Sequence, residues 1–331
     1  MVKSRQGLCW SVFVVCAAMM WPGFATGQNP ALPAGAPAEA PEREAGSRQA
    51  NDAGLELARD ALRRAQWPDA ERAARGYLQD HEGSAEGHYL LALALFRENH
   101  PRESLAEYTH AARLQRPTAL QLRWVALDYV LLGAYKDADT WMSKSLEWNP
   151  EDGESWYELG RIKYSEGRFG EAVEAFNKAL RLLPRSVKAE NNLGLADEGL
   201  NRPDDAIAAY QQALAWQAGA ASRSEQPMLN LGILLTDKYR LDEALPLLRE
   251  AESIAPGDSK IHAALGKLYE RKNDLAHAQA EFEQAVGLDS KSAGLHFQLG
   301  QVYRKLGEKG KAAGEFAQAS ALDGTHSSDS Q

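Results

Sequence analysis

Three asparagines have the residue type and spacing best suited to a binding function. Asn191 and Asn192 stand side by side in KAENNLGLADEGL (188–200), and Asn230 recurs in the similar segment PMLNLGILL (227–235). Asparagine is a mediocre helix former, because its amide competes for nearby backbone groups. A carboxamide also offers both a donor and an acceptor, so it can hold one peptide unit through two hydrogen bonds. We therefore interpret the three amides as candidate contacts to an extended chain. The alternative is that they only face solvent.

No catalytic constellation accompanies these amides. The sequence lacks H-E-x-x-H, G-x-S-x-G, a P-loop and G-x-G-x-x-G. Its eight histidines are scattered, without metal-ligand spacing on one helical face. We therefore predict a protein that is not an enzyme, with no catalytic residue, no cofactor and no metal site.

Composition and charge restrict the class of partner. The chain has 331 residues, of which 44% are hydrophobic and 25% are charged, as is ordinary for a folded soluble protein. The formal net charge is −9. Because nucleic acids and anionic membrane surfaces attract basic patches, this charge argues against both as main partners. A protein or peptide partner is the remaining expectation.

The first 27 residues have the order of a secretory signal peptide. Lys3 and Arg5 give a basic start, an apolar run follows from Leu8 to Trp21, and the small residues Ala25 and Gly27 form a cleavage site. The apolar run is shorter than the roughly 20 residues of a spanning helix. We expect cleavage after Gly27 and a periplasmic or secreted protein without membrane insertion. The alternative is an uncleaved anchor in the inner membrane.

The segment after the cleavage site does not look like part of a folded domain. Residues 28–50 are rich in Pro, Ala and Gly and lack a core-forming pattern, so we interpret them as a disordered linker. Both cysteines, Cys9 and Cys16, precede this linker. The mature chain would therefore contain no disulfide, thiolate metal site or cysteine nucleophile.

The rest of the chain repeats itself. Units start at residues 51, 85, 119, 153, 187, 225, 259 and 293, and every spacing is 34 except one of 38. Each unit carries two helical patterns joined by a short turn. Within a unit the seventh position is aliphatic, the eighth is Ala or Gly, the twentieth is small, and the twenty-fourth is usually large. Five glycines at the eighth position cost roughly 1 kcal/mol each relative to alanine and so need a packing reason. We expect the large residue to pack between neighbouring units, and the four-residue insertion within 215–227 to add about one helical turn.

This period and these residues resemble the tetratricopeptide repeat family over residues 51–326, followed by a polar tail at 327–331. The resemblance implies an all-α, right-handed solenoid of eight helix-turn-helix units. It also implies that the first helix of each unit lines the concave side, through positions 2, 5, 6, 9, 12 and 13. Asn192 and Asn230 then fall on position 6, and Tyr157, Arg161, Lys188 and Asn191 fall on the same side.

Units two and three carry a different inner side. HYLLALALF and ALQLRWVALDYVLLG are apolar nearly all round, and the resemblance places Tyr89, Phe96 and Trp124 on the concave face. A helix that is apolar on every face must bury all of it. One interpretation is tight packing within the array. The other, which we favour, is an apolar groove for a partner helix or for self-association through units two and three, since aromatic anchors dominate interfaces.

Together these features predict a non-catalytic, exported scaffold or adaptor that binds a partner protein or peptide in its concave groove within the cell envelope. The alternative function is a regulatory or substrate-recruiting subunit of an envelope enzyme complex. The sequence does not name the partner.

Overall fold

The computed structural model describes residues 53–328, with their side chains up to residue 323. The predicted signal peptide, the linker over 28–50 and residues 329–331 lie outside this part. Every regular element among the described residues is a helix, which confirms the all-α solenoid. None of these helices is both long enough and apolar enough to cross a membrane.

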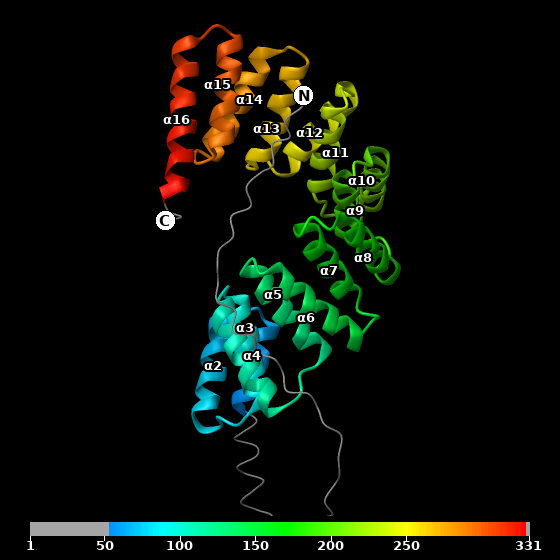
Figure 1. Ribbon diagram of the computed structural model, residues 1–331, viewed down its shortest axis with the longest axis vertical. Coiled ribbons are helices and arrows are strands. Elements are labelled where there is room, and N and C mark those ends of the chain that lie inside the picture. Colours follow the sequence, from blue (N-terminus) through cyan, green and yellow to red (C-terminus); the bar gives the residue numbers. More distant parts are fainter. Residues whose placement is uncertain (1–52, 329–331) are drawn as a thin grey trace, which may run out of the picture. The chain divides into compact units, whose positions relative to one another are not determined.

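The helices form eight pairs that follow one another in chain order (Figure 1). The first pair joins the helix over 53–63 to α2 (Trp67–Asp80). The remaining pairs are α3 (Ala85–Arg97) with α4 (Pro101–Leu114), α5 (Ala119–Leu131) with α6 (Tyr135–Trp148), α7 (Gly153–Ser165) with α8 (Phe169–Leu182), α9 (Val187–Gly199) with α10 (Pro203–Gln217), α11 (Gln226–Asp237) with α12 (Leu241–Ile254), α13 (Ser259–Arg271) with α14 (Leu275–Leu288), and α15 (Ala293–Lys305) with α16 (Lys309–Ser328). The predicted starts from residue 85 onward agree with these first helices to within one residue.

A capping residue fixes where most first helices begin. A serine, threonine or aspartate stands just before the helix and accepts a hydrogen bond from a backbone N–H of its first turn, which stabilises the helix by about 1 kcal/mol. These caps are Ser84, Thr118, Asp152, Ser186, Asp258 and Ser292. The cap is missing at α11, which follows the insertion and begins after Glu225 without a side-chain cap.

The turn between the two helices of a repeat is built the same way each time. The fifteenth residue of every repeat has a left-handed backbone, with φ between 57° and 80°. Glycine adopts this conformation without strain and asparagine tolerates it, whereas for other residues it is unfavourable in free energy. The eight residues are Ala65, Asn99, Gly133, Gly167, Asn201, Tyr239, Asn273 and Gly307.

The large residue at position 24 lies in one core cluster with residues of the next repeat, as expected, since Phe176 clusters with Ala189 and Ala196. It also packs closely inside its own repeat. A Cβ placed on Gly160 would lie 2.5 Å from the Phe176 ring, and one placed on Gly194 would lie 2.6 Å from the Tyr210 ring. Gly232, Gly266 and Gly300 meet Leu248, Phe282 and Phe316 in the same way. The glycine therefore makes room for an aromatic ring or a leucine side chain from the second helix of the same repeat.

The aliphatic residue at position 7 also reaches across a junction, to the preceding repeat. Leu91 lies in a core cluster with Ala58 and Ala74 of the first repeat and is 2% exposed. Leu57 holds the same position but is 65% exposed, and Leu55 is buried in its place. No described repeat precedes the first one, so no residue of a preceding repeat covers Leu57 within the described part of the chain.

The insertion forms a loop, not the extra helical turn that we expected. α10 has 15 residues where most other second helices have 14, and the remaining insertion lies between Gln217 and α11. The buried Gln217 amide holds this loop, since Nε2 donates to Ser224 O at 2.9 Å and Oε1 accepts from Ser224 N at 3.0 Å. A carboxamide does bind the backbone N–H and C=O of one residue here, but that residue belongs to the chain's own loop.

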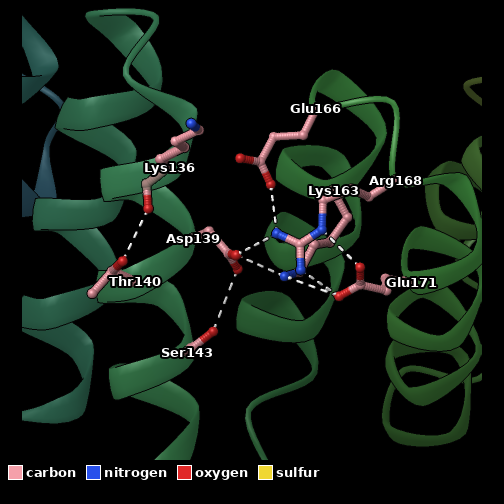
Figure 2. A network of polar contacts seen from close by, with 8 residues as sticks. All are labelled: Lys136, Asp139, Thr140, Ser143, Lys163, Glu166, Arg168 and Glu171. Atoms are coloured by element: carbon pink, nitrogen blue, oxygen red, sulfur yellow. Dashed lines mark hydrogen bonds and ion pairs between the residues drawn. The ribbon is translucent and has the colours of Figure 1, made fainter.

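An ionic network joins the third and fourth repeats (Figure 2). Asp139 of α6 accepts from Lys163 Nζ of α7 at 2.7 Å and from Arg168 Nη1 in the following turn at 2.7 Å. Arg168 also pairs with Glu166 and Glu171. Hydrogen bonds to these three carboxylates raise the pKa of Arg168. Both cations are satisfied within the junction, so the network stabilises the fold and leaves no charge for a ligand.

Candidate functional site

The first helices of several neighbouring repeats lie side by side and form an inner face. They contact one another directly at α3–α5, α7–α9, α9–α11 and α11–α13, in addition to packing against second helices. The second helices of successive repeats make no contact of similar extent among the described residues. First helices are therefore closer together than second helices, as on the inner side of a curved stack.

The predicted polar residues of units four to six meet on this inner face. Tyr157 and Arg161 come from α7, Lys188 and Asn192 from α9, and Asn230 from α11. We call these five residues, with Glu158, the inner polar cluster. Positions 2, 5, 6 and 9 are three or four residues apart, so they lie on one face of each helix.

The asparagines bond between repeats in a constant register. Asn192 Nδ2 donates to the Tyr157 hydroxyl at 3.0 Å, and Asn230 Nδ2 donates to Asn191 Oδ1 at 2.9 Å. In both pairs a position-6 amide reaches position 5 of the preceding repeat. Asn191 is only 7% exposed, so it mainly supports Asn230. The insertion between units five and six does not break this register.

Asn192 and Asn230 keep hydrogen-bonding capacity after these contacts. Each uses one N–H, and no described residue bonds to either Oδ1 atom. Both side chains are half-buried. Each amide is thus held in place by the neighbouring repeat while an acceptor and a second N–H stay available to a ligand.

Tyr157 anchors the charged part of the cluster. Its ring is 8% exposed, with Lys188 Nζ at 4.5 Å and Arg161 Cζ at 5.9 Å from the ring centroid. Lys188 Nζ lies 2.6 Å from Glu154 Oε2, and Arg161 Nη1 lies 2.8 Å from Glu158 Oε2. Burial raises the pKa of Glu158, and the two cations oppose this shift. The cluster therefore has paired charges around amides that are neutral.

Two of the three aromatic residues predicted for units two and three have their rings in contact. Phe96 of α3 and Trp124 of α5 have ring centroids 5.3 Å apart, and Arg97 Cζ lies 4.8 Å from the Trp124 ring. The same guanidinium lies 5.3 Å from the Trp67 ring. Tyr89 is 8% exposed and donates its hydroxyl to Gln115 O, so it is a packing residue. We call Trp67, Phe96, Arg97 and Trp124 the aromatic cluster.

Exposed leucines continue this surface on α5. Leu120 is 48% exposed and Leu131 is 47% exposed, at the two ends of the helix. Phe96 and Trp124 are half-buried by each other and by Arg97. The apolar helices predicted from HYLLALALF and ALQLRWVALDYVLLG are thus only partly covered by the array.

One group outside the inner face could suit a metal ion. Side-chain atoms of Glu252, His262 and Glu281 lie within 4.8 Å of one another. Arg249 Nη1 lies 2.8 Å from a carboxylate oxygen of each glutamate, and His262 Nε2 contacts Pro256 O at 3.1 Å. Because the Arg249 guanidinium already forms salt bridges to both carboxylates, we interpret the group as two structural salt bridges.

The sequence reasoning missed the acidic partners of the inner polar cluster. Glu154 and Glu158 occupy positions 2 and 6 of the fourth unit. Glu158 pairs with Arg161, three residues later on the same helix. Glu154 pairs with Lys188, 34 residues later on the next first helix. It also missed Arg97, at position 13 of the second unit, whose guanidinium lies 4.8 Å from the Trp124 ring. A helix-face analysis of charge would have found all three.

Comparison with family models identifies the repeat. A model described as tetratricopeptide repeat matches residues 153–186, and a second with the same description matches residues 191–259 and 263–326. Together these matches cover slightly more than half of the chain. The chain belongs to the tetratricopeptide repeat family.

Two curated relatives of this tetratricopeptide repeat protein illustrate its range. It is 26% identical over 194 residues to Protein O-mannosyl-transferase TMTC3 of Mus musculus, covering 52% of this chain and 21% of the relative. It is 27% identical over 160 residues to Anaphase-promoting complex subunit 3 of Schizosaccharomyces pombe, covering 48% of this chain and 23% of the relative. The chain thus spans less than a quarter of the length of these two relatives.

Solved structures share its fold at low identity. A tetratricopeptide repeat protein from Parabacteroides merdae aligns with a TM-score of 0.62 at 16% identity, covering 77% of this chain and 99% of that one. The APC/C hetero-tetramer Cut9–Hcn1 aligns with a TM-score of 0.59 at 19% identity, covering 85% of this chain and 57% of that one. These likenesses establish the repeat architecture.

Proposed function

We propose that this protein is a non-catalytic scaffold that binds an extended segment of a partner protein along the inner face of α7, α9 and α11. The observation that carries the proposal is the register of the amides. Asn192 and Asn230 are each fixed by a bond to the preceding repeat, yet each keeps an acceptor and an N–H unpaired among the described residues.

Such amides suit a peptide backbone. Successive first helices present equivalent positions, so amides from neighbouring repeats can contact successive parts of one extended chain. Each contact would contribute about 0.5–1.5 kcal/mol net, so two amides alone give weak affinity. Tyr157 and the paired charges of Lys188 and Arg161 supply the rest of the surface.

The test separates binding from folding. In Asn192→Asp the Tyr157 hydroxyl can donate to the new carboxylate, so the bond between repeats survives, while the N–H donors offered to a peptide carbonyl disappear. The matched control is Asn177→Asp on α8, because Asn177 is exposed and bonds only within its own helix. Partners are captured from native envelope extract on each variant of the full chain.

The proposal expects a partner that is retained by the wild type and the Asn177→Asp control and lost by Asn192→Asp. Equal retention by all three, with circular dichroism showing the same fold, would rule out the amides as peptide contacts. Attention would then move to the aromatic cluster.

A second candidate function is a substrate-recruiting subunit of an envelope enzyme complex. The observation that favours it is the relative named as an O-mannosyl-transferase. Enzymatic activity that co-purifies with the array, and that is absent from the purified chain alone, would distinguish recruitment from pure assembly.

We propose the cell envelope as the location, on the basis of the N-terminal order of residues 1–27. The periplasm or the exterior follows if the mature protein begins near Gln28, which N-terminal sequencing of the native protein would establish. Retention of Met1 would instead favour a chain anchored in the inner membrane.

A further inference from the structure

Asp128 is a buried acid that the binding surface does not use. It lies on α5 at the tenth position of the third repeat and is 0% exposed. The tenth position of the other repeats from the second onward is buried and apolar. Those residues are Ala94, Ile162, Ala196, Leu234, Leu268 and Val302.

The hydrogen bonds of Ser104 indicate how this acid is held. Ser104 Oγ lies 2.6 Å from Asp128 Oδ2 and 2.9 Å from Ala92 O. A serine hydroxyl has one hydrogen, so it donates to one of these oxygens only. Both contacts are hydrogen bonds at once if the hydroxyl donates to Ala92 O and a protonated Asp128 donates to Ser104 Oγ.

The surroundings of Asp128 also disfavour an ionised carboxylate. Asp128 Oδ1 is buried without a hydrogen-bond partner, and an unpaired buried charge is far more costly than an unpaired carbonyl oxygen. Among the described residues no cation pairs with Asp128. Arg123, on the same helix, bonds Asp152 instead.

The groups facing Asp128 from the elements packed against it supply no countercharge. From α4 they are Ser104 and the buried Tyr108 hydroxyl, which itself has no hydrogen-bond partner. From α3, Arg97 acts on Tyr108 and lies 4.8 Å from the Trp124 ring centroid, without pairing with Asp128. Within the described chain α6 contributes no ion pair to this acid. Burial, opposed by the Ser104 hydrogen bond, raises the pKa of Asp128 to about 7.

We propose that Asp128 is a neutral carboxylic acid in the folded array, and that the contact between the second and third repeats is a proton-linked contact that loosens as the pH rises toward neutrality. Asp128 links α3, α4 and α5, and Trp124 lies one helical turn before it. The contact that the proton stabilises is therefore the one that carries the aromatic cluster.

The sign of the pH dependence follows from proton counting. Between about pH 4 and pH 7 an unfolded aspartate is ionised while folded Asp128 keeps its proton, so the folded contact binds one more proton than the opened one. The equilibrium between closed and open contact then shifts about tenfold toward the open form for each pH unit in this window. Above about pH 7 neither form holds the proton and the dependence ends.

The test is hydrogen exchange of the α4 and α5 amides in the full chain, compared at each pH with the variant D128N. An amide at this position can donate to Ser104 Oγ permanently and has no proton to lose. Comparison at equal pH cancels the intrinsic pH dependence of exchange. The matched control is D60N, because Asp60 holds the same tenth position in the first repeat but has a side chain that is 37% exposed and pairs with Arg63 and Arg64.

The expected result is that wild-type protection falls about tenfold per pH unit relative to D128N between pH 5 and pH 7, while D60N follows the wild type. A wild-type to D128N ratio that stays constant over this range would overturn the proposal. Carbon NMR titration of the Asp128 carboxyl in the wild type gives a second answer that needs no variant. A midpoint near that of an ordinary aspartate, about pH 4, would also overturn it.

Discussion

The contact between Gly160 and Phe176 offers the sharpest test of how a repeat is packed. Substitution Gly160→Ala places a Cβ 2.5 Å from the ring of Phe176, which is 1% exposed and cannot move into solvent. Overpacking of this kind costs about 1–3 kcal/mol. Alanine recovers about 1 kcal/mol of helix propensity, so the net loss should be about 1 kcal/mol.

A pair already present in the chain supplies the rescue. The third repeat has Ala126 and Met142 at the same two positions, in one core cluster. Phe176→Met alone should cost less than about 1.5 kcal/mol, because methionine is smaller and flexible. The double variant Gly160→Ala/Phe176→Met should lose less unfolding free energy than the sum of the two single variants. The difference, which is the coupling energy, should be about 1 kcal/mol.

Urea unfolding followed by circular dichroism measures all three variants. The control is Gly170→Ala on α8, where an added Cβ meets nothing within 4 Å, so stability should stay unchanged or rise by up to about 1 kcal/mol. The reasoning fails if Gly160→Ala is as stable as Gly170→Ala, or if the costs of the double variant simply add.

Three further predictions follow from the turns, the exposed leucines and the buried histidine. Ala65 has φ 57° in an exposed turn, so Ala65→Gly should raise the free energy of unfolding by up to about 1 kcal/mol. Thermal denaturation measures the change, and an unchanged midpoint would argue against backbone strain at Ala65. Leu120→Glu adds an acid to the first turn of α5, which the helix dipole favours. The folded monomer should survive while any self-association seen for the wild type by analytical ultracentrifugation is lost, and a persisting oligomer would remove α5 from the interface. Burial opposes protonation of His262, but its bonds to Glu281 and Pro256 outweigh burial and raise its pKa. The stabilisation that protonated His262 provides is complete below about pH 6.5, the pKa of an unfolded histidine. It is lost as the pH rises through the higher pKa of His262 in the folded protein. Glu281→Gln should therefore flatten the pH dependence of hydrogen exchange in α13 and α14.

The repeat architecture was predictable because its packing rules recur every 34 residues. Small residues at the eighth and twentieth positions are buried in every repeat, from Ala58 and Ala70 to Gly300 and Ala312. The starts of the first helices follow from capping residues such as Ser84 and Ser186, just before each of these helices. Local chemistry and period agree here, which is why the sequence determined helix positions so closely.

The neighbours of each large residue were not predictable in the same way. Periodicity shows that Phe176 is buried, but not that its ring lies against Gly160 of its own repeat as well as in a cluster with Ala189 and Ala196 of the next repeat. The insertion misled for a related reason, because the Ala-rich segment after Trp216 favours helix while the Gln217 amide holds it as a loop. Both outcomes depend on three-dimensional contacts that a one-dimensional period does not contain.

The sequence predicted which residues lie together at the candidate site better than it predicted what each residue contacts. Tyr157, Lys188, Asn192 and Asn230 do meet on the inner face, as their positions implied. Their bonds between repeats were not foreseen, because they depend on how far α9 is offset from α7 and α11. Asn191 shows the consequence, since its burial makes it a support for Asn230.

The most direct test of the central claim is photo-crosslinking in the native cell envelope, with a photoreactive phenylalanine analogue in place of Lys188 on the inner face or of Gln211 on α10. Both positions are exposed, and they lie on the two helices of one repeat. A scaffold that binds its partner along α7, α9 and α11 predicts a protein adduct from the Lys188 position, none from the Gln211 position, and loss of the adduct when Asn192→Asp is added. Adducts of equal yield from both positions, or from Gln211 alone, would contradict binding on the inner face.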